Sequence, residues 1–155
     1  MLITVGNSRK QRSMVKIKYP KYYKDLSIND LKNKCLEIFD TKLKGKKVIN
    51  SNSGAIIKLS KKGAKHALFA RGAGFNKVLC VSKIDQILRH GKMYSIERSK
   101  SKGVLFVIKF LTEVSIDSEN MYVITFIRST NSGEMYYDHA VIEQKKPQDY
   151  RNGFL

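Results

Sequence analysis

The hydrophobic pattern of this chain changes its period at Gly91, and that change constrains the fold more than any other feature. Before Gly91 the apolar residues recur at helical spacing, whereas after it they alternate with a period of two. Four strand patterns follow, at 92–99, 104–114, 120–130 and 134–143, and short polar turns join them. Short turns favour antiparallel neighbours over parallel crossovers. The sequence therefore predicts a four-stranded antiparallel β-meander.

The first helix signal is Ser27, which is a good N-cap. Apolar residues recur at helical spacing over 28–39 and give this segment one apolar face. A turn-rich sequence, 50–54, then separates two short strand-like pieces, 47–50 and 55–60. These features predict a helix followed by a β-hairpin.

Two further helices are predicted between the hairpin and the meander. Ser60 caps one that runs through Ala70, and Ser82 with Asp85 cap the other, over 83–90. The fold class predicted from these elements is α+β. N-terminal helices and a short hairpin come first, and the four-stranded antiparallel meander follows.

The chain has the length of one domain, with 155 residues and 42% apolar content to build a packed core. Its start carries seven basic residues and no acid before Asp25, with tyrosines among them. We predict a basic N-terminal arm over 1–24, a single α+β domain over 25–146 and a C-terminal tail over 147–155. The arm is either mobile or a contact for RNA, since basic residues interleaved with aromatic ones suit stacking and charge.

The positive charge is concentrated in one acid-free segment. The formal net charge is +17, and residues 41–84 hold eleven Lys and Arg without a single Asp or Glu. A basic surface of this kind indicates a polyanionic partner, and we expect RNA or single-stranded nucleic acid. An acidic protein, such as an inhibitor or antitoxin, is the alternative partner.

His66 lies inside the acid-free segment, beside Lys65 and shortly before Arg71. Histidine exchanges a proton near neutral pH, and the cations around it would stabilise a phosphate. This combination fits a metal-independent ribonuclease. A solvated basic face that only binds nucleic acid explains the same residues and stays open as the alternative.

The other two histidines have structural explanations as well as functional ones. His90 ends a predicted helix, where the helix dipole favours a cation. His139 lies in the last predicted strand next to Asp138, where cross-strand packing explains it at least as well as catalysis.

Other candidate site residues fall on the predicted strands. Tyr94, Arg98 and Lys109 lie on neighbouring strands and are expected to face one cleft. Thr125 and Arg128 share a later strand, where alternation puts them on opposite faces unless a bulge intervenes.

Metal sites, disulfides and membrane spans have no signal in the sequence. The carboxylates are scattered singly and no HxxxH or HExxH pattern occurs, so we expect no metal and no other cofactor. Cys35 and Cys80 lack CxxC spacing and are expected to be buried and reduced. No segment approaches the roughly 20 apolar residues of a membrane span. We expect a soluble cytoplasmic protein with no membrane partner.

The order of elements and the basic helix resemble the barnase–EndoU–colicin–RelE (BECR) nuclease superfamily, and specifically its divergent members in large polyvalent phage proteins and toxin domains. The resemblance covers roughly Asp25 to Glu143. It rests on Gly45-Lys46-Lys47-Val48-Ile49-Asn50, Gly54, Ile57-Lys58-Leu59-Ser60, Lys62-Gly63-Ala64-Lys65-His66 and Tyr136-Tyr137-Asp138-His139.

The resemblance implies a metal-independent endoribonuclease, a toxin or phage effector, that cleaves RNA through its 2′-hydroxyl in a bacterial cell. It implies His66 as acid/base, Arg71 and Arg98 as phosphate ligands, and Thr125 as a hydroxyl donor. The sequence departs from the expected site because no second histidine is obviously placed as a partner for His66. A catalytically inactive nucleic-acid-binding member is therefore the alternative.

The predicted site has two parts. The catalytic candidates are His66, Arg71, Arg98, Thr125 and His139. The nucleic-acid-binding candidates are Lys58, Lys61, Lys62, Lys65, Tyr94, Lys109 and Arg128.

Overall fold

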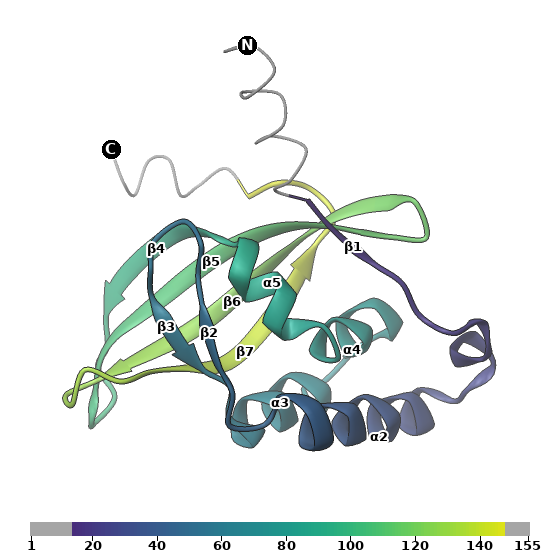
Figure 1. The fold of residues 1–155 in the computed structure, drawn as a ribbon, viewed down its shortest axis with the longest axis horizontal. Helices are drawn as coiled ribbons and strands as arrows, with labels where there is room; N and C mark the ends of the chain where they lie inside the picture. Colours follow the sequence, from purple (N-terminus) through teal and green to yellow (C-terminus); the bar gives the residue numbers. More distant parts are fainter. Residues whose placement is uncertain (1–13, 148–155) are drawn as a thin grey trace, which may run out of the picture.

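A curled, mixed sheet of seven strands forms a half-barrel in the computed structural model, which describes residues 14–147 (Figure 1). The strands are β1 (Met14–Ile17), β2 (Lys47–Ile49), β3 (Ile56–Lys58), β4 (Lys92–Arg98), β5 (Val104–Ile116), β6 (Glu119–Thr130) and β7 (Met135–Glu143). The helices are α2 (Ile28–Ile38), α3 (Lys61–Leu68), α4 (Phe75–Val81) and α5 (Ile84–His90), with a 3-10 helix η1 (Lys21–Asp25) and a π-helical segment η2 (Phe39–Leu43).

The predicted four-stranded antiparallel meander is wrong as a description of the sheet. Strands β4 to β7 do pair antiparallel in chain order, but they are only part of it. Strand β1 adds a parallel pairing to the second half of β5, and the β2–β3 hairpin joins through a parallel pairing of β3 with the start of β7. These parallel pairs join segments far apart in the chain, and no local periodicity encodes such pairings.

The sheet also extends N-terminal of the domain boundary that we predicted at residue 24. Val15 and Ile17 of β1 are buried and belong to the hydrophobic core. Residues 1–13 of the predicted arm and nearly all of the predicted tail lie outside the described residues.

The helices fill the hollow of the half-barrel and lie below it (Figure 1). Helix α5 packs on β2 and β5 inside the curl, while α2 and α4 pack on each other and α3 packs on β7. Cys35 and Cys80 lie in this core as free, buried thiols, as predicted. Burial raises the pKa of Cys35 to about 11 and that of Cys80 to about 12, so both thiols stay protonated.

Two of the predicted helix caps are confirmed. Ser27 accepts a hydrogen bond from the Asp30 N–H at 3.1 Å, and Ser60 accepts one from the Gly63 N–H at 3.2 Å. Ser82 does not cap α5. It follows α4, a helix missing from the sequence-based prediction, and its hydroxyl donates to the Leu79 carbonyl at 2.6 Å.

Asn50 fastens the hairpin to the end of α5. Its side chain is fully buried and donates to the carbonyl oxygens of Leu88 and Gly91, both at 2.7 Å. The side-chain oxygen of Asn50, Oδ1, accepts hydrogen bonds from the backbone N–H groups of Asn52 and Ser53. The amide therefore holds the β2–β3 turn against the core, which helps the sheet to curl around α5.

None of the helices within residues 14–147 combines the length and the apolar character that crossing a bilayer requires.

We predict that Asn50→Ala lowers the free energy of unfolding by about 1–3 kcal/mol, because the Leu88 carbonyl loses its side-chain donor and the N–H groups of Asn52 and Ser53 lose their acceptor. Urea denaturation with an unchanged m-value measures the loss. Asn52→Ala is the matched control, since its exposed amide donates to the same Gly91 carbonyl at 2.9 Å and water replaces it. Equal losses in the two variants would contradict the role assigned to Asn50.

Candidate active site

Helix α3 takes the place of a strand beside β7. Strand β3 pairs with β7 only as far as Tyr136, and beyond it α3 covers the edge. The Ser60 hydroxyl donates to the Tyr137 carbonyl at 3.1 Å. Gly63 faces the same carbonyl, and a Cβ at this position would collide with the oxygen. This close approach brings His66, one turn further along α3, over the edge of β7.

A β-bulge in β7 supplies the other half of the site. Phe126 pairs with His139 and Ile127 pairs with Tyr137, so Asp138 is an extra residue between them. Neighbouring residues of a regular strand point to opposite faces. The bulge re-aims the side chains, and Asp138 contacts His139 directly.

The carboxylate of Asp138 is the centre of the cluster. Its side chain is only 8% exposed, and each oxygen has cationic or imidazole neighbours. Oδ1 lies 3.2 Å from Arg128 Nε, while Oδ2 lies 2.6 Å from His139 Nδ1 and 3.8 Å from His66 Nδ1. A buried carboxylate needs such partners, and here they tie β6, β7 and α3 to one point.

His139 is held in one orientation by two contacts. Its ring stacks on Phe126 with centroids 4.2 Å apart, and its Nδ1 donates to Asp138, since a carboxylate only accepts. Burial lowers the pKa of His139, and His66 and Lys77 lower it further, against the raising effect of Asp138. The ring is therefore neutral near pH 7, with its Nε2 lone pair available.

The sheet face around this cluster is basic and aromatic. Cross-strand pairing aligns His139, Phe126 and Lys109 in one row across β7, β6 and β5. Lys109 Nζ lies 5.2 Å from the centre of the Phe126 ring and 3.6 Å from Glu97. His66 contacts the end of this row, with its ring centroid 4.8 Å from that of His139.

The structure brings together two of the five residues predicted as catalytic, His66 and His139. Thr125 is fully buried on the opposite face of β6, and its hydroxyl points to the Phe110 carbonyl at 3.4 Å. Arg71 is exposed in the turn after α3. Arg98 pairs with Phe106 at the end of β4. Phe106 is three residues from Lys109 on β5, so alternation puts Arg98 on the opposite face of the sheet from Lys109. None of these three contacts the Asp138 carboxylate.

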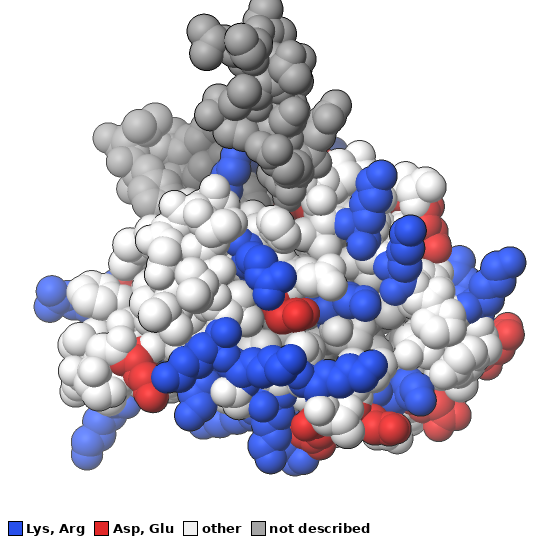
Figure 2. Space-filling view, viewed as in Figure 1, with Lys and Arg blue, Asp and Glu red and all other residues white. Residues whose placement is uncertain are grey.

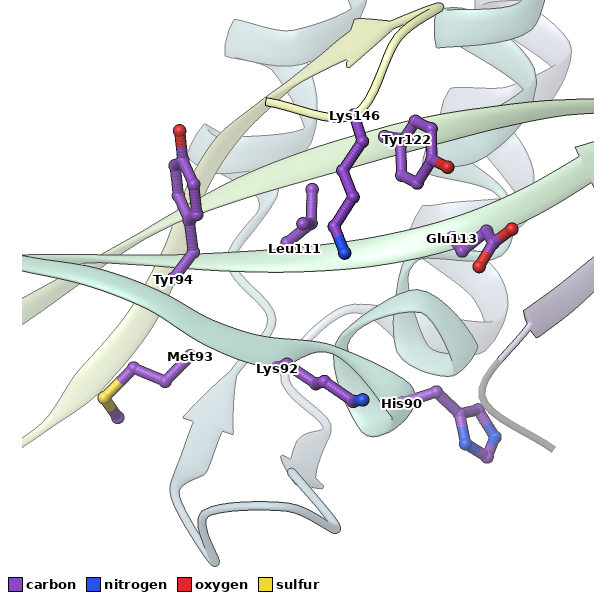
Figure 3. Close-up of a pocket in the computed structure, with 8 residues that line it drawn as sticks. All are labelled: His90, Lys92, Met93, Tyr94, Leu111, Glu113, Tyr122 and Lys146. Carbon is purple, nitrogen blue, oxygen red and sulfur yellow. The ribbon is translucent and has the colours of Figure 1, made fainter. Parts of the chain in front are cut away.

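Most of the predicted nucleic-acid-binding residues lie on or beside the same face. Arg128 contacts Asp138. Tyr136 pairs with Arg128 on one side and with Lys58 on the other, so these three residues form one row across β6, β7 and β3. Lys62 precedes His66 by one helical turn, and the exposed Lys65 adjoins it. Two candidates are not part of the cluster around Asp138. Lys61 is paired with Asp40 at 2.9 Å, and Tyr94 lines a pocket further along the sheet (Figure 3).

The sequence reasoning missed Asp138 and Phe126 as parts of the site. Regular alternation would turn Asp138 away from His139, so strand periodicity does not indicate that these two side chains are in contact. The one clue in the sequence is that Asp138 and His139 are neighbours in Tyr136-Tyr137-Asp138-His139, a segment that carries the resemblance to the nuclease superfamily.

A family model, Large polyvalent protein-associated domain 3, matches residues 26–137. The chain belongs to this family. Membership confirms that it is a domain of the phage polyvalent protein type, whereas the nuclease superfamily stays a prediction. Comparisons with curated proteins and with solved structures each returned no significant match.

The His66, Asp138 and His139 cluster of this family member also has the donor types of a metal site. Their ligand atoms all lie within 4.8 Å of one another, which differs from the sequence-based expectation that no such cluster exists. The ligands come from two separate elements, so no spacing rule detects them. Arg128 occupies the other oxygen of Asp138 and Lys77 adds positive charge near His139, and both favour an anion over a cation.

We predict opposite shifts of the His139 pKa in two variants of this domain. Asp138→Asn removes the charge that raises it, so the pKa falls further. Lys77→Met removes a charge that lowers it, so the pKa rises. NMR titration of the His139 ring protons measures both shifts.

Glu97→Gln is the control for this titration, since that carboxylate contacts Lys109 rather than the histidines. Shifts of the same sign in both test variants would contradict the electrostatic account of His139.

Proposed function

We propose that this domain is a metal-independent endoribonuclease in which His66 and His139 act as acid and base. The observation that carries the proposal is the convergence of both imidazoles on the buried Asp138 carboxylate, at the edge of a basic sheet face. Cleavage of RNA by its own 2′-hydroxyl needs two proton-transfer groups and cations around the phosphate. The pair also supports membership of the BECR superfamily, as a toxin or phage effector acting in a bacterial host cell.

His139 suits the general base. Its Nδ1–H is held by Asp138, so Nε2 carries the lone pair, and its lowered pKa keeps the ring neutral near pH 7. Nε2 takes the proton of the 2′-hydroxyl while that oxygen forms its bond to phosphorus. The bond from phosphorus to the 5′ oxygen then breaks, which leaves a 2′,3′-cyclic phosphate.

His66 suits the general acid. Its side chain is 54% exposed, so a substrate can reach it, and Asp138 pairs with the ring whenever it is protonated. It lies on the far side of the carboxylate from Arg128, next to the His139 ring. From there it donates its proton to the departing 5′ oxygen.

Arg128 and Lys109 suit the stabilisation of the transition state. Arg128 contacts Asp138 through Nε at 3.2 Å, and its guanidinium carries further N–H donors of the kind that bind a phosphate oxygen. Lys109 is three-quarters buried above Phe126, in the same row as His139. Partial burial lowers the local dielectric constant, so these charges interact more strongly with a phosphate than fully solvated charges do.

We predict that His66→Ala and His139→Ala each reduce RNA cleavage by roughly 10²–10⁴-fold, the usual contribution of a general acid or base. The measurement is cleavage of single-stranded RNA in excess chelator, with detection of 2′,3′-cyclic phosphate ends. DNA of the same sequence stays intact because it lacks the attacking hydroxyl. Arg128→Ala also slows cleavage, whereas Arg89→Ala, an exposed cation at the end of α5, does not.

Cleavage that is abolished by chelator and restored by a divalent metal would overturn the metal-independent route. It would transfer His66, Asp138 and His139 to the role of metal ligands. If the wild-type protein binds RNA without cutting it, the ribonuclease proposal is wrong and the second candidate function takes its place.

That second candidate is nucleic-acid binding without cleavage, and a separate basic groove favours it. Figure 2 shows Lys and Arg side chains across the lower half of the face that carries the helices. A cavity of about 370 Å³ between η1, η2, α4 and α5 is lined by Lys18, Lys42, Lys46 and Lys83. Among residues 14–147, Asp85 is the only acid that lines this groove, and no histidine lines it.

We predict that Lys42→Glu combined with Lys46→Glu weakens RNA binding more than the same charge change elsewhere. Lys100→Glu with Lys102→Glu, in the exposed β4–β5 turn, is the matched control. Affinity measured at several salt concentrations decides, because lost phosphate contacts also reduce the salt dependence. Equal weakening by both pairs would assign the effect to net charge and exclude a groove.

A further inference from the structure

A pocket lies on the same sheet face as the candidate active site, further along the strands (Figure 3). Its volume is about 260 Å³. Its lining includes the rings of Tyr94 and Tyr122, the apolar side chain of Leu111, and the charged groups of Lys92, Lys146 and Glu113. In Figure 3 the Lys146 side chain reaches down between the two tyrosines.

Strand register gives the distance between the pocket and the site. Leu111 is two residues from Lys109 on β5, and Tyr122 is four residues from Phe126 on β6. Each step of two residues on one face spans roughly 7 Å. The pocket is therefore next to the row of His139, Phe126 and Lys109, close enough for one RNA strand to occupy both.

The chemistry of the pocket fits a nucleobase. Tyrosine rings stack on unpaired bases, and Leu111 offers an apolar floor to the same ring. Lys92 and Lys146 add positive charge to the lining, which can pair with the phosphates that flank the base. Glu113 repels phosphate, so the end of the pocket near Glu113 favours the base. The carboxylate of Glu113 can accept hydrogen bonds from N–H groups of that base.

We propose that this pocket binds the base of a nucleotide next to the cleaved bond of single-stranded RNA. The proposal rests on the proposed ribonuclease function, because that function places the scissile phosphate at His66 and His139. Stacking in the pocket would then fix which phosphate reaches the two histidines.

The test uses a short single-stranded 2′-O-methyl RNA, which cannot be cut, and a series in which each base in turn is removed. Removing the base that occupies the pocket weakens binding to the wild-type protein by about 5- to 100-fold. In Tyr122→Leu the same removal has no further effect, since the stacking partner is already lost. Tyr122→Phe keeps the ring and behaves as wild type. Phe69→Leu, at the exposed end of α3 and outside the pocket, is the control for loss of a surface aromatic ring.

The results separate this proposal from the proposed function. Abasic penalties that are identical in wild type and Tyr122→Leu overturn the pocket, even if the protein cleaves ordinary RNA. A penalty that depends on Tyr122 in a protein without cleavage supports the pocket and overturns the ribonuclease. A wild-type protein that neither binds nor cleaves RNA overturns both.

Discussion

The close packing of α3 against β7 is the contact on which the rest of the site depends. Gly63 has no side chain, so the helix lies directly on the Tyr137 carbonyl, and Ser60 ties its first turn to the same oxygen. The contact covers an open strand edge, which would otherwise expose unpaired backbone groups. It also fixes the height of His66 above the sheet. A larger residue at position 63 would push the helix, and with it the imidazole, away from Asp138.

The bulge at Asp138 complements this contact from the side of the sheet. One extra residue in β7 lets a carboxylate and the adjacent histidine act together, which regular alternation forbids. The carboxylate then links three elements, because Arg128 comes from β6, His139 from β7 and His66 from α3. Helix packing and strand irregularity thus converge on one buried charge, and neither alone would assemble the cluster.

Local chemistry made part of this structure predictable. The caps at Ser27 and Ser60 and the strands of the meander follow from residues close in the chain. The parallel pairing of β1 with β5 does not, because register between distant segments depends on tertiary packing. The site residues also divide into those that local sequence predicts and those that depend on tertiary packing. His66 was found from the charge around it, whereas its pairing with His139 needed α3 to lie on β7, and Thr125 proved to face the core.

The balance of charge around Asp138 decides what the cluster can do. Two imidazoles and a carboxylate can hold a metal, but here Arg128 already neutralises the carboxylate and Lys77 lies near His139. A dication would therefore meet a surrounding of net positive charge, and neutral His139 would be needed as its ligand. A phosphate meets the opposite situation, because Arg128 and Lys77 attract it and the two imidazoles beside Asp138 can transfer protons. The same positive neighbours that weaken a cation site strengthen an anion site, so electrostatics favours acid/base chemistry on a phosphodiester.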